Sequence, residues 1–208
     1  MPYYTRVLTK QEDYPLFDEV ADLIRAEHPQ FKLHLEEGTE EDWESLLLAS
    51  EDEVEVALIE RNPVYDGSLG QDEIADFLED LRDCKPDSGV EWLKEYLAEV
   101  KTIYAFQHLQ GADSEEGSAA LHGLRSALWD RGESIIQADL EGFTNEEGFH
   151  IVWQFSDTVS GAWNMAILQD GTWNHFKMDL GDPDQRAAFL RGEVPPDVAS
   201  VQLARKED

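Results

Sequence analysis

The stretch "KTIYAFQHL", residues 101–109, decides how the rest of the chain is interpreted. Its apolar residues follow one another with little interruption, which is typical of a strand buried on both faces. Such a strand needs neighbouring strands along both edges and other elements covering its faces. We therefore place residues 101–109 at the centre of a fold that combines helices with a sheet.

Outward from this strand, the spacing of apolar residues changes repeatedly, so strands and helices alternate along the chain. A spacing of two predicts strands at residues 3–8, 31–35 and 54–60. A spacing of three or four predicts helices at residues 15–27, 68–81 and 88–97 and a helix that ends at Gly132. We also expect a short helix that begins at Thr39 and carries Trp43. Ser68 with Gln71, and Ser88 with Glu91, have the form of capping boxes.

In the last third of the chain, short apolar runs separated by turn residues predict a four-strand antiparallel meander. Its strands are expected at residues 134–143, 149–155, 162–168 and 172–178. Asp170-Gly171 is typical of a two-residue hairpin turn. That turn would place Leu168 opposite Trp173, Ala166 opposite His175, and Asn164 opposite Lys177.

These patterns together predict an α+β protein built from two sheet-and-helix halves, the second of which contains the meander. The expected boundary lies near residue 100, with an acidic half at residues 1–100 and the other half at residues 101–208. The alternative is a single domain that covers residues 1–200.

Charge is the strongest compositional feature: 46 acidic and 16 basic side chains give a formal net charge of −30. A field of this sign repels nucleic acids and anionic lipid surfaces, so we expect neither as a partner. No apolar run is long enough to span a membrane, and the N-terminus does not have the pattern of a secretion signal. The single cysteine, Cys84, excludes an internal disulfide. A cytoplasmic location is therefore expected.

The acidity has two interpretations. It could serve a basic protein partner, because complementary charge speeds encounter and excludes wrong partners. It could instead be an adaptation of the whole protein to high salt, with no specific functional role. Residues 1–100 carry 28 acidic and 8 basic residues, so a basic partner would be expected to approach this part of the chain.

A candidate metal or ligand site lies in the stretch "QADLEGFTNEEGFH", residues 137–150. Asp139 and Glu141 would lie on the same face of a strand, and Glu147 and His150 would follow at its turn. Carboxylate oxygens are the ligands that magnesium, manganese or calcium prefer, and a metal-bound water could hydrolyse a substrate. The alternative is a solvated strand face beside a polar turn.

The hairpin at residues 162–178 offers a candidate interaction surface. One of its faces would carry Asn164, Trp173, His175 and Lys177, and the opposite face is apolar and predicted to be core. Phosphate-binding loops, dinucleotide fingerprints, HExxH and GxSxG are missing from the sequence. The leading hypothesis is therefore a non-enzymatic intracellular protein, of the inhibitor or immunity kind, that binds a basic partner. A metal-dependent hydrolase and a salt-adapted protein are the alternatives.

Overall fold

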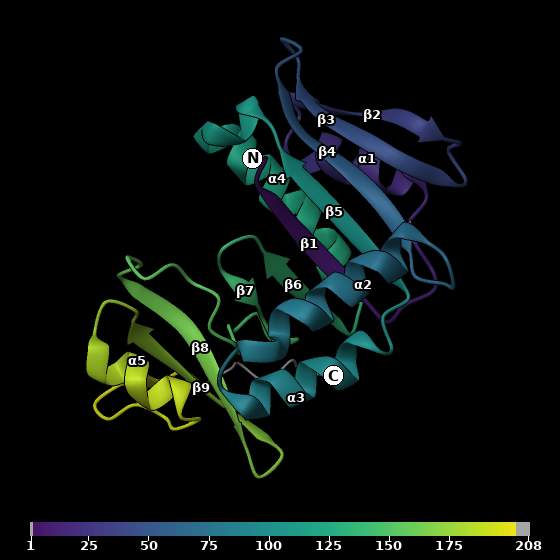
Figure 1. Cartoon of the computed structure of the whole chain (residues 1–208). Coiled ribbons are helices and arrows are strands. Elements are labelled where there is room, and N and C mark those ends of the chain that lie inside the picture. The colour runs from purple at the N-terminus through teal and green to yellow at the C-terminus, as the bar shows by residue number, and fades with distance from the viewer. Residues whose placement is uncertain (1, 203–208) are drawn as a thin grey trace. The chain divides into compact units, whose positions relative to one another are not determined.

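The computed structural model describes residues 2–202 and shows an α+β fold with antiparallel sheets (Figure 1). Its contacts divide the chain into two compact units. The first unit holds residues up to 75 together with 99–139, and the second holds 76–98 together with residues from 140 onward. Each unit is thus made of two separate stretches of chain, which differs from the single boundary near residue 100 that the sequence suggested.

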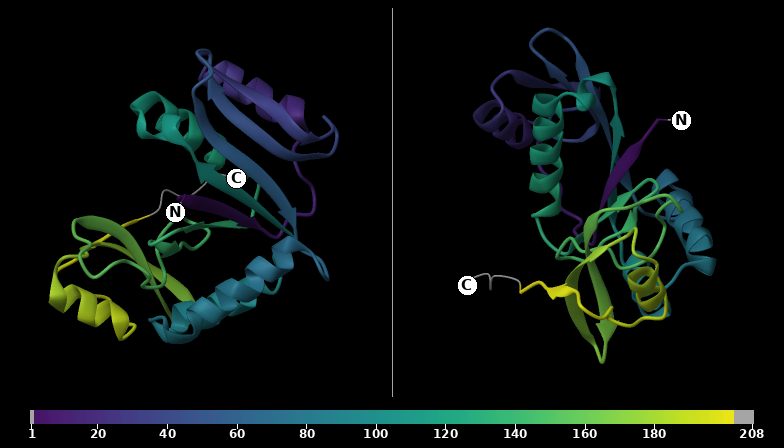
Figure 2. Two further views of the ribbon diagram at one scale, coloured as in Figure 1. Left: turned by 45° about the horizontal axis from the view of Figure 1, so that its top comes forward. Right: turned by 90° about the vertical axis from the view of Figure 1, so that its left-hand side faces the viewer.

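The first unit is built on an antiparallel sheet with the strand order β2-β3-β4-β5-β1-β6. Its strands are β1 (Tyr4–Thr9), β2 (Phe31–Gly38), β3 (Trp43–Ser50), β4 (Glu55–Pro63), β5 (Thr102–His108) and β6 (Ser134–Ala138). Its helices are α1 (Phe17–Glu27), the first half of α2 (Leu69–Asp80), the short 3-10 helix η2 (Gln110–Asp113) and α4 (Glu115–Trp129). Helices α1 and α4 pack on one face of this sheet (Figure 2).

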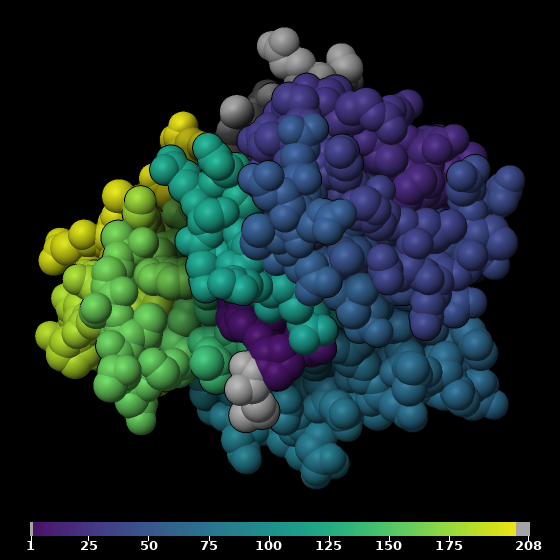
Figure 3. Space-filling model, turned by 90° about the horizontal axis from the view of Figure 1, so that it is seen from above, coloured from purple at the N-terminus to yellow at the C-terminus, as the bar shows by residue number. Residues whose placement is uncertain are grey.

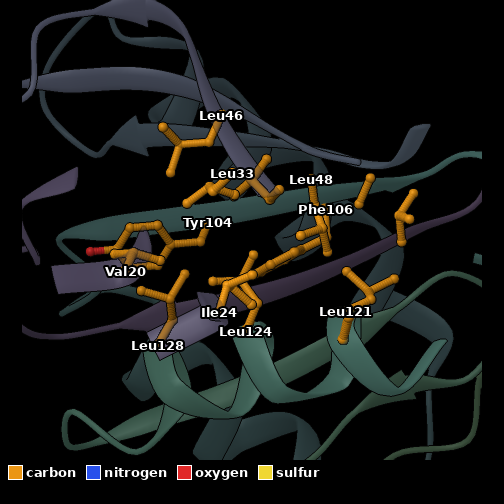
Figure 4. Packing of buried hydrophobic residues seen from close by; sticks show 14 of the residues in the cluster. Val20, Ile24, Leu33, Leu46, Leu48, Tyr104, Phe106, Leu121, Leu124 and Leu128 are labelled. Atoms are coloured by element: carbon orange, nitrogen blue, oxygen red, sulfur yellow. The ribbon is translucent and has the colours of Figure 1, made fainter. Parts of the chain in front are cut away.

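The strand predicted at residues 101–109 is confirmed as a central one. β5 pairs with β4 along one edge and with β1 along the other. Its residues from Thr102 to Phe106 are all buried. Figure 4 shows Tyr104 and Phe106 pointing toward Leu121, Leu124 and Leu128 of α4, which form part of the same hydrophobic cluster. The continuous apolar run therefore reflects a strand that is covered by protein.

The helix expected from Thr39 onward is wrong, because Trp43–Ser50 forms β3. This strand lies between β2 and β4 and hydrogen-bonds to both. Its leucines favour a helix by intrinsic propensity, but pairing along both edges and burial of Trp43, Leu46 and Leu48 override that preference. A register shift between Leu48 and Ala49 also breaks the strict alternation by which a strand is recognised.

The second unit contains a three-stranded antiparallel sheet with the order β10-β9-β8. Its elements are the end of α2, the 3-10 helix η1 (Leu81–Asp83), α3 (Asp87–Leu97), the two-residue strand β7 (Gly142–Phe143), β8 (Ala162–Gln169), β9 (Thr172–Asp179), α5 (Pro183–Leu190) and β10 (Ala199–Ser200). The apolar face of its sheet packs against α5 through Phe189, which is fully buried.

The register of the last hairpin is confirmed, because β8 and β9 pair as the Asp170-Gly171 turn requires. Both turn residues have positive φ, 50° and 74°, as a type I′ turn demands. The expected strand at residues 149–155 does not form, and this stretch contributes only isolated bridges through His150. The backbone of His150 bonds to Asn164 and Ala166 of β8, but the N–H of Trp153 donates to the carbonyl of Lys85, so the pairing does not continue along this segment.

Candidate functional site

The first unit contains a hollow of about 430 Å³. Its walls come from the turn between β2 and β3, from the end of β4, and from the segment that leads into α2. These walls carry the polar side chains of Asp42, Glu44 and Arg61 and the apolar side chains of Tyr65 and Leu69. A volume of this size is typical of sites that hold a small molecule or one large side chain.

Arg61 is the fixed part of the hollow, since only 8% of its side chain is exposed. Its Nε–H donates to the backbone carbonyl of Trp43 at 2.7 Å, and Nη2 donates to Oδ1 of Asp42 at 2.5 Å. The guanidinium carbon lies 3.9 Å from the ring centroid of Tyr14, a cation–π geometry. Arg61 therefore acts as a support that orients the turn between β2 and β3.

Asp42 receives a second hydrogen bond, from the hydroxyl group of Tyr14 at 2.8 Å. This bond, followed by the charge of Arg61, lowers the pKa of the Asp42 carboxyl below its ordinary value. The same bond is the main cause of the raised pKa of Tyr14. Asp42 is consequently held in its charged form at the edge of the hollow.

The opposite wall is the start of α2. The hydroxyl oxygen of Ser68 accepts hydrogen bonds from the backbone N–H groups of Tyr65 and Gln71, each at 3.1 Å, which confirms Ser68 as the capping residue. The side chain of Gln71 does not close the predicted box, because it accepts from the backbone of Gly67. At Gly70 an added Cβ would lie 2.7 Å from the carbonyl oxygen of Pro63, so only glycine permits this close approach of α2 to β4.

Two apolar side chains at this wall are exposed to solvent. Tyr65 is 65% exposed and Leu69 is 77% exposed, and both line the hollow. Neighbouring exposed apolar groups at a concave site are typical of surfaces that contact another molecule. They supply the hollow with a patch on which the aliphatic part of a bound group can lie.

The acidic rim of the hollow is the end of the β2–β3 hairpin, residues 36–44. Its six carboxylates are all exposed, and they belong to Glu36, Glu37, Glu40, Glu41, Asp42 and Glu44. Gly38, with φ of 93°, makes the turn possible because an added Cβ would overlap the carbonyl oxygen of Asp42. In the space-filling view, strands β2 to β4 are the indigo and blue surface (Figure 3). Asp42 and Glu44 of this rim line the hollow, and among the described residues only Asp42 of the six lies within 4.0 Å of an arginine or lysine, its partner being Arg61.

The four residues of the predicted metal site are divided between the two units. Asp139 belongs to the first unit, where its Oδ1 accepts a hydrogen bond from Arg6 at 2.8 Å and its Oδ2 accepts from the backbone of Tyr4 at 3.0 Å. Glu141, Glu147 and His150 belong to the second unit. Within residues 2–202, no group of three or more His, Cys, Asp or Glu side chains is arranged to hold a metal ion.

His150 is the buried member of this set. It is 9% exposed, its ring lies 5.1 Å from that of Phe155 and 5.2 Å from that of Trp163, and burial lowers its pKa to about 4. A hydrogen bond with the backbone of Glu141 acts in the opposite direction but is the smaller effect. His150 is thus a neutral, packed side chain at physiological pH.

The predicted interaction surface on β8 and β9 is partly used within its own unit. Trp173 lies edge-on to Trp92 of α3, with 5.3 Å between ring centroids. His175 lies 4.4 Å from the ring of Phe149 and only 11% of its side chain is exposed. Asn164 and Lys177 face each other across the hairpin, and both are exposed.

Comparison of the chain with protein-family models, with curated proteins and with solved structures finds no match. Among residues 2–202, no helix has the length and apolar character needed to cross a membrane. Cys84 has a free thiol that donates to the carbonyl of Asp80 at 3.2 Å, and burial raises its pKa. A raised pKa disfavours the reactive thiolate.

Sequence reasoning missed this hollow for a specific reason. Asp42 and Glu44 were assigned to a helix, on which they would not line the same site as Arg61. The sequence did contain a usable signal. Tyr65 and Leu69 are large apolar residues in a segment rich in glycine and polar residues, where burial of both in the core is not expected.

Proposed function

We propose that this chain is a non-enzymatic cytoplasmic binding protein whose first unit receives a basic protein partner, in the manner of an inhibitor or an immunity-type protein. The observation that carries the proposal is the hollow with exposed Tyr65 and Leu69, which is also lined by the exposed carboxylates of Asp42 and Glu44 from the acidic rim. A lysine or arginine side chain has both parts that such a site needs, an apolar stem and a cationic end. The stem would lie on Leu69 and the charge would face Glu44.

The distribution of basic residues along the chain supports the binding of a cationic partner at the acidic rim. Within residues 2–202, ten arginine and lysine side chains lie within 4.0 Å of a carboxylate: Arg6, Lys10, Arg25, Lys32, Arg61, Arg82, Lys85, Arg131, Arg186 and Arg191. Between Leu33 and Glu60 the sequence contains no lysine or arginine at all. Apart from Asp42, which is paired with Arg61, no carboxylate of the rim at residues 36–44 lies within 4.0 Å of a described arginine or lysine, so most of the negative charge of the rim is available to an external group.

A library of random 12-residue peptides displayed on phage tests the proposal, with the full chain as immobilised target. We expect enriched peptides to contain lysine or arginine beside an apolar residue. Their affinity should fall by about tenfold or more for the double variant Tyr65→Ser/Leu69→Ser. Both positions are exposed, so these substitutions leave the core intact. Enrichment of peptides without basic residues would contradict the proposal.

A pair of charge-matched variants separates this proposal from the salt-adaptation alternative. Glu41→Gln/Glu44→Gln removes two charges at the rim, and Asp52→Asn/Glu55→Gln removes two exposed charges at the opposite end of β3 and β4. We expect only the first pair to weaken peptide binding. If both pairs weaken peptide binding equally, binding depends on the overall acidity of the chain and not on the rim. That result would favour salt adaptation.

A further inference from the structure

β2 is the outermost strand at one end of the sheet in the first unit (Figure 1). It pairs with β3, and within residues 2–202 no strand lies along its other edge. Proteins commonly block a free edge of this kind with proline, with a very short strand or with a β-bulge. β2 has eight residues and no proline, and its register with β3 is continuous over Phe31–Leu35. The edge is therefore open to pairing along this stretch.

The register of β2 with β3 decides which backbone groups face the open edge. In an antiparallel pair, successive residues alternate between bonding to the neighbouring strand and pointing away from it. The N–H of Glu51 donates to the carbonyl of Gln30 at 2.9 Å, so residue 30 bonds toward the β3 side. The N–H of Phe31 instead donates to the carbonyl of His28 at 2.9 Å, away from its β3 partner Ser50. Odd-numbered residues of this stretch thus point outward.

It follows that Leu33 and Leu35 direct their N–H and C=O groups to the open edge, whereas Lys32 and His34 bond toward β3. Outside the β2–β3 pair, no described residue hydrogen-bonds to the backbone of Leu33 or Leu35. Their side chains anchor the strand, because Leu33 belongs to the hydrophobic cluster of the first unit and Leu35 packs against it (Figure 4). The edge is therefore held in place before any partner binds.

Both ends of this edge are acidic. At one end β2 runs into the rim, and Glu36 and Glu37 lie on the strand itself. At the other end lies the turn between β3 and β4, whose exposed acidic residues are Glu51, Asp52 and Glu53. Lys32 is the single lysine or arginine of β2, and its Nζ lies 3.9 Å from Glu51. A second copy of the chain would bring the same acidic ends together, which disfavours self-pairing.

We infer that β2 receives an extended basic segment of the partner protein as an added strand. The inference rests on the proposed function, because it takes the partner to be basic. The four outward backbone groups of Leu33 and Leu35 bind the segment whatever its side chains are, as in other cases of strand addition. Lysine or arginine residues along the segment face the acidic ends of the edge, which selects a basic sequence.

The experiment is amide hydrogen exchange, measured by NMR on the full chain with and without the peptide acetyl-Lys-Val-Lys-Val-Lys-Val-Lys-amide. In the free chain, we expect the amide protons of Leu33 and Leu35 to exchange faster than those of Lys32 and His34, because only the latter two bond to β3. At a peptide concentration of ten times Kd, exchange at Leu33 and Leu35 should slow by about tenfold.

The outcomes distinguish this inference from the proposed function. Binding of the peptide that shifts signals of the rim without slowing exchange at Leu33 and Leu35 would overturn the inference and leave the proposed function standing. Slow exchange at both residues in the free chain would also overturn it, because the edge would already be occupied. No binding at millimolar peptide would overturn it too. The displayed library tests the proposed function separately, since its peptides need not be extended.

The matched variants are Leu35→Pro and Leu35→Ala. Both lose the leucine side chain, but only proline also removes the N–H group that faces the edge. Proline is tolerated on an edge strand where the N–H points outward. We expect Leu35→Pro to bind the peptide about threefold or more weakly than Leu35→Ala. Equal affinities would contradict strand addition. If Leu35→Pro does not fold, the exchange measurement on the natural chain still decides the inference.

Discussion

The side-chain amide nitrogen of Asn145 lies 3.1 Å from Nε2 of His175. The other end of this amide is fixed, because Oδ1 accepts hydrogen bonds from the backbone N–H groups of Glu147 at 3.2 Å and Phe149 at 2.9 Å. Nδ2 must therefore donate to Nε2, which leaves the imidazole proton on Nδ1. Burial lowers the pKa of His175, and the charge of Glu147 opposes this effect. The arrangement selects a neutral imidazole in one tautomer.

The isosteric substitution Asn145→Asp tests that arrangement. The aspartate retains the acceptor for the two backbone N–H groups but turns a carboxylate oxygen toward Nε2, which then favours the protonated ring. We expect the pKa of His175 to rise from below its ordinary value to above it. The chemical shift of the His175 ring proton against pH measures this directly. An unchanged titration curve would show that Asn145 does not set the tautomer.

His150 makes a different prediction, about stability. Its pKa is about 4 in the folded chain, against an ordinary value of 6.5. Between these two pH values the unfolded chain binds a proton that the folded chain does not. The free energy of unfolding should therefore fall as the pH is lowered from 6.5 toward 4, by roughly 3 kcal/mol from this residue.

Because other groups titrate in the same range, the measurement is a comparison of the natural chain with His150→Gln. Glutamine keeps a polar donor at this position but does not titrate. We expect urea unfolding to give a flatter pH dependence for the variant between pH 6.5 and 4. Parallel curves for the two proteins would mean that His150 binds its proton at the same pH in the folded and the unfolded chain.

Arg6 predicts a stability effect in the first unit. Its side chain is 14% exposed and lies 2.5 Å from Oε1 of Glu73 and 2.8 Å from Oδ1 of Asp139. Arg6→Gln would leave two partly buried carboxylates without a counter-charge, and we expect a loss of about 2–3 kcal/mol in the free energy of unfolding.

The matched control is Arg25→Gln, whose partner Asp22 lies one turn away on α1. Both side chains of that pair are largely exposed, 72% and 70%, so the expected change is below about 0.5 kcal/mol. Urea unfolding of the two variants under one set of conditions measures the difference. Similar losses in the free energy of unfolding for the two variants would show that the effect comes from the change in net charge and not from the partly buried contacts of Arg6.

The parts of the fold that the sequence predicted are those fixed by local chemistry. The Asp170-Gly171 turn permits only one pairing of β8 with β9, and that pairing was predicted residue by residue. Trp43–Ser50 was assigned to a helix, because pairing with strands distant in sequence cannot be read from leucine spacing. Ser88 was expected to cap α3, but this helix begins at Asp87, and within residues 2–202 the hydroxyl oxygen of Ser88 has no hydrogen-bond partner.

The hollow of the first unit was beyond the sequence for a related reason. Approaches between distant segments, such as that of α3 to the β8–β9 turn about 75 residues later in the chain, are not specified by any local pattern. Helical spacing alone could have placed Ser88, Glu91 and Glu95 on one face. The acidic stretch at residues 137–150 was more conspicuous by composition, yet its Asp139 is occupied by Arg6.

Gly89 provides a test of how tightly α3 is held. An added Cβ at this position would overlap a backbone oxygen, that of Ile151, which cannot move aside as a flexible side chain can. We expect Gly89→Ala to destabilise the chain by about 1–3 kcal/mol, despite the higher helix propensity of alanine.

The control is Gly123→Ala in α4, where the added Cβ would meet only side-chain atoms, nearest among them Nε2 of His28 at 2.9 Å. His28 can rotate away, so this change should be neutral or stabilising by up to about 1 kcal/mol. Thermal and urea unfolding of both variants would decide the point, and a neutral Gly89→Ala would mean that α3 can shift away from Ile151.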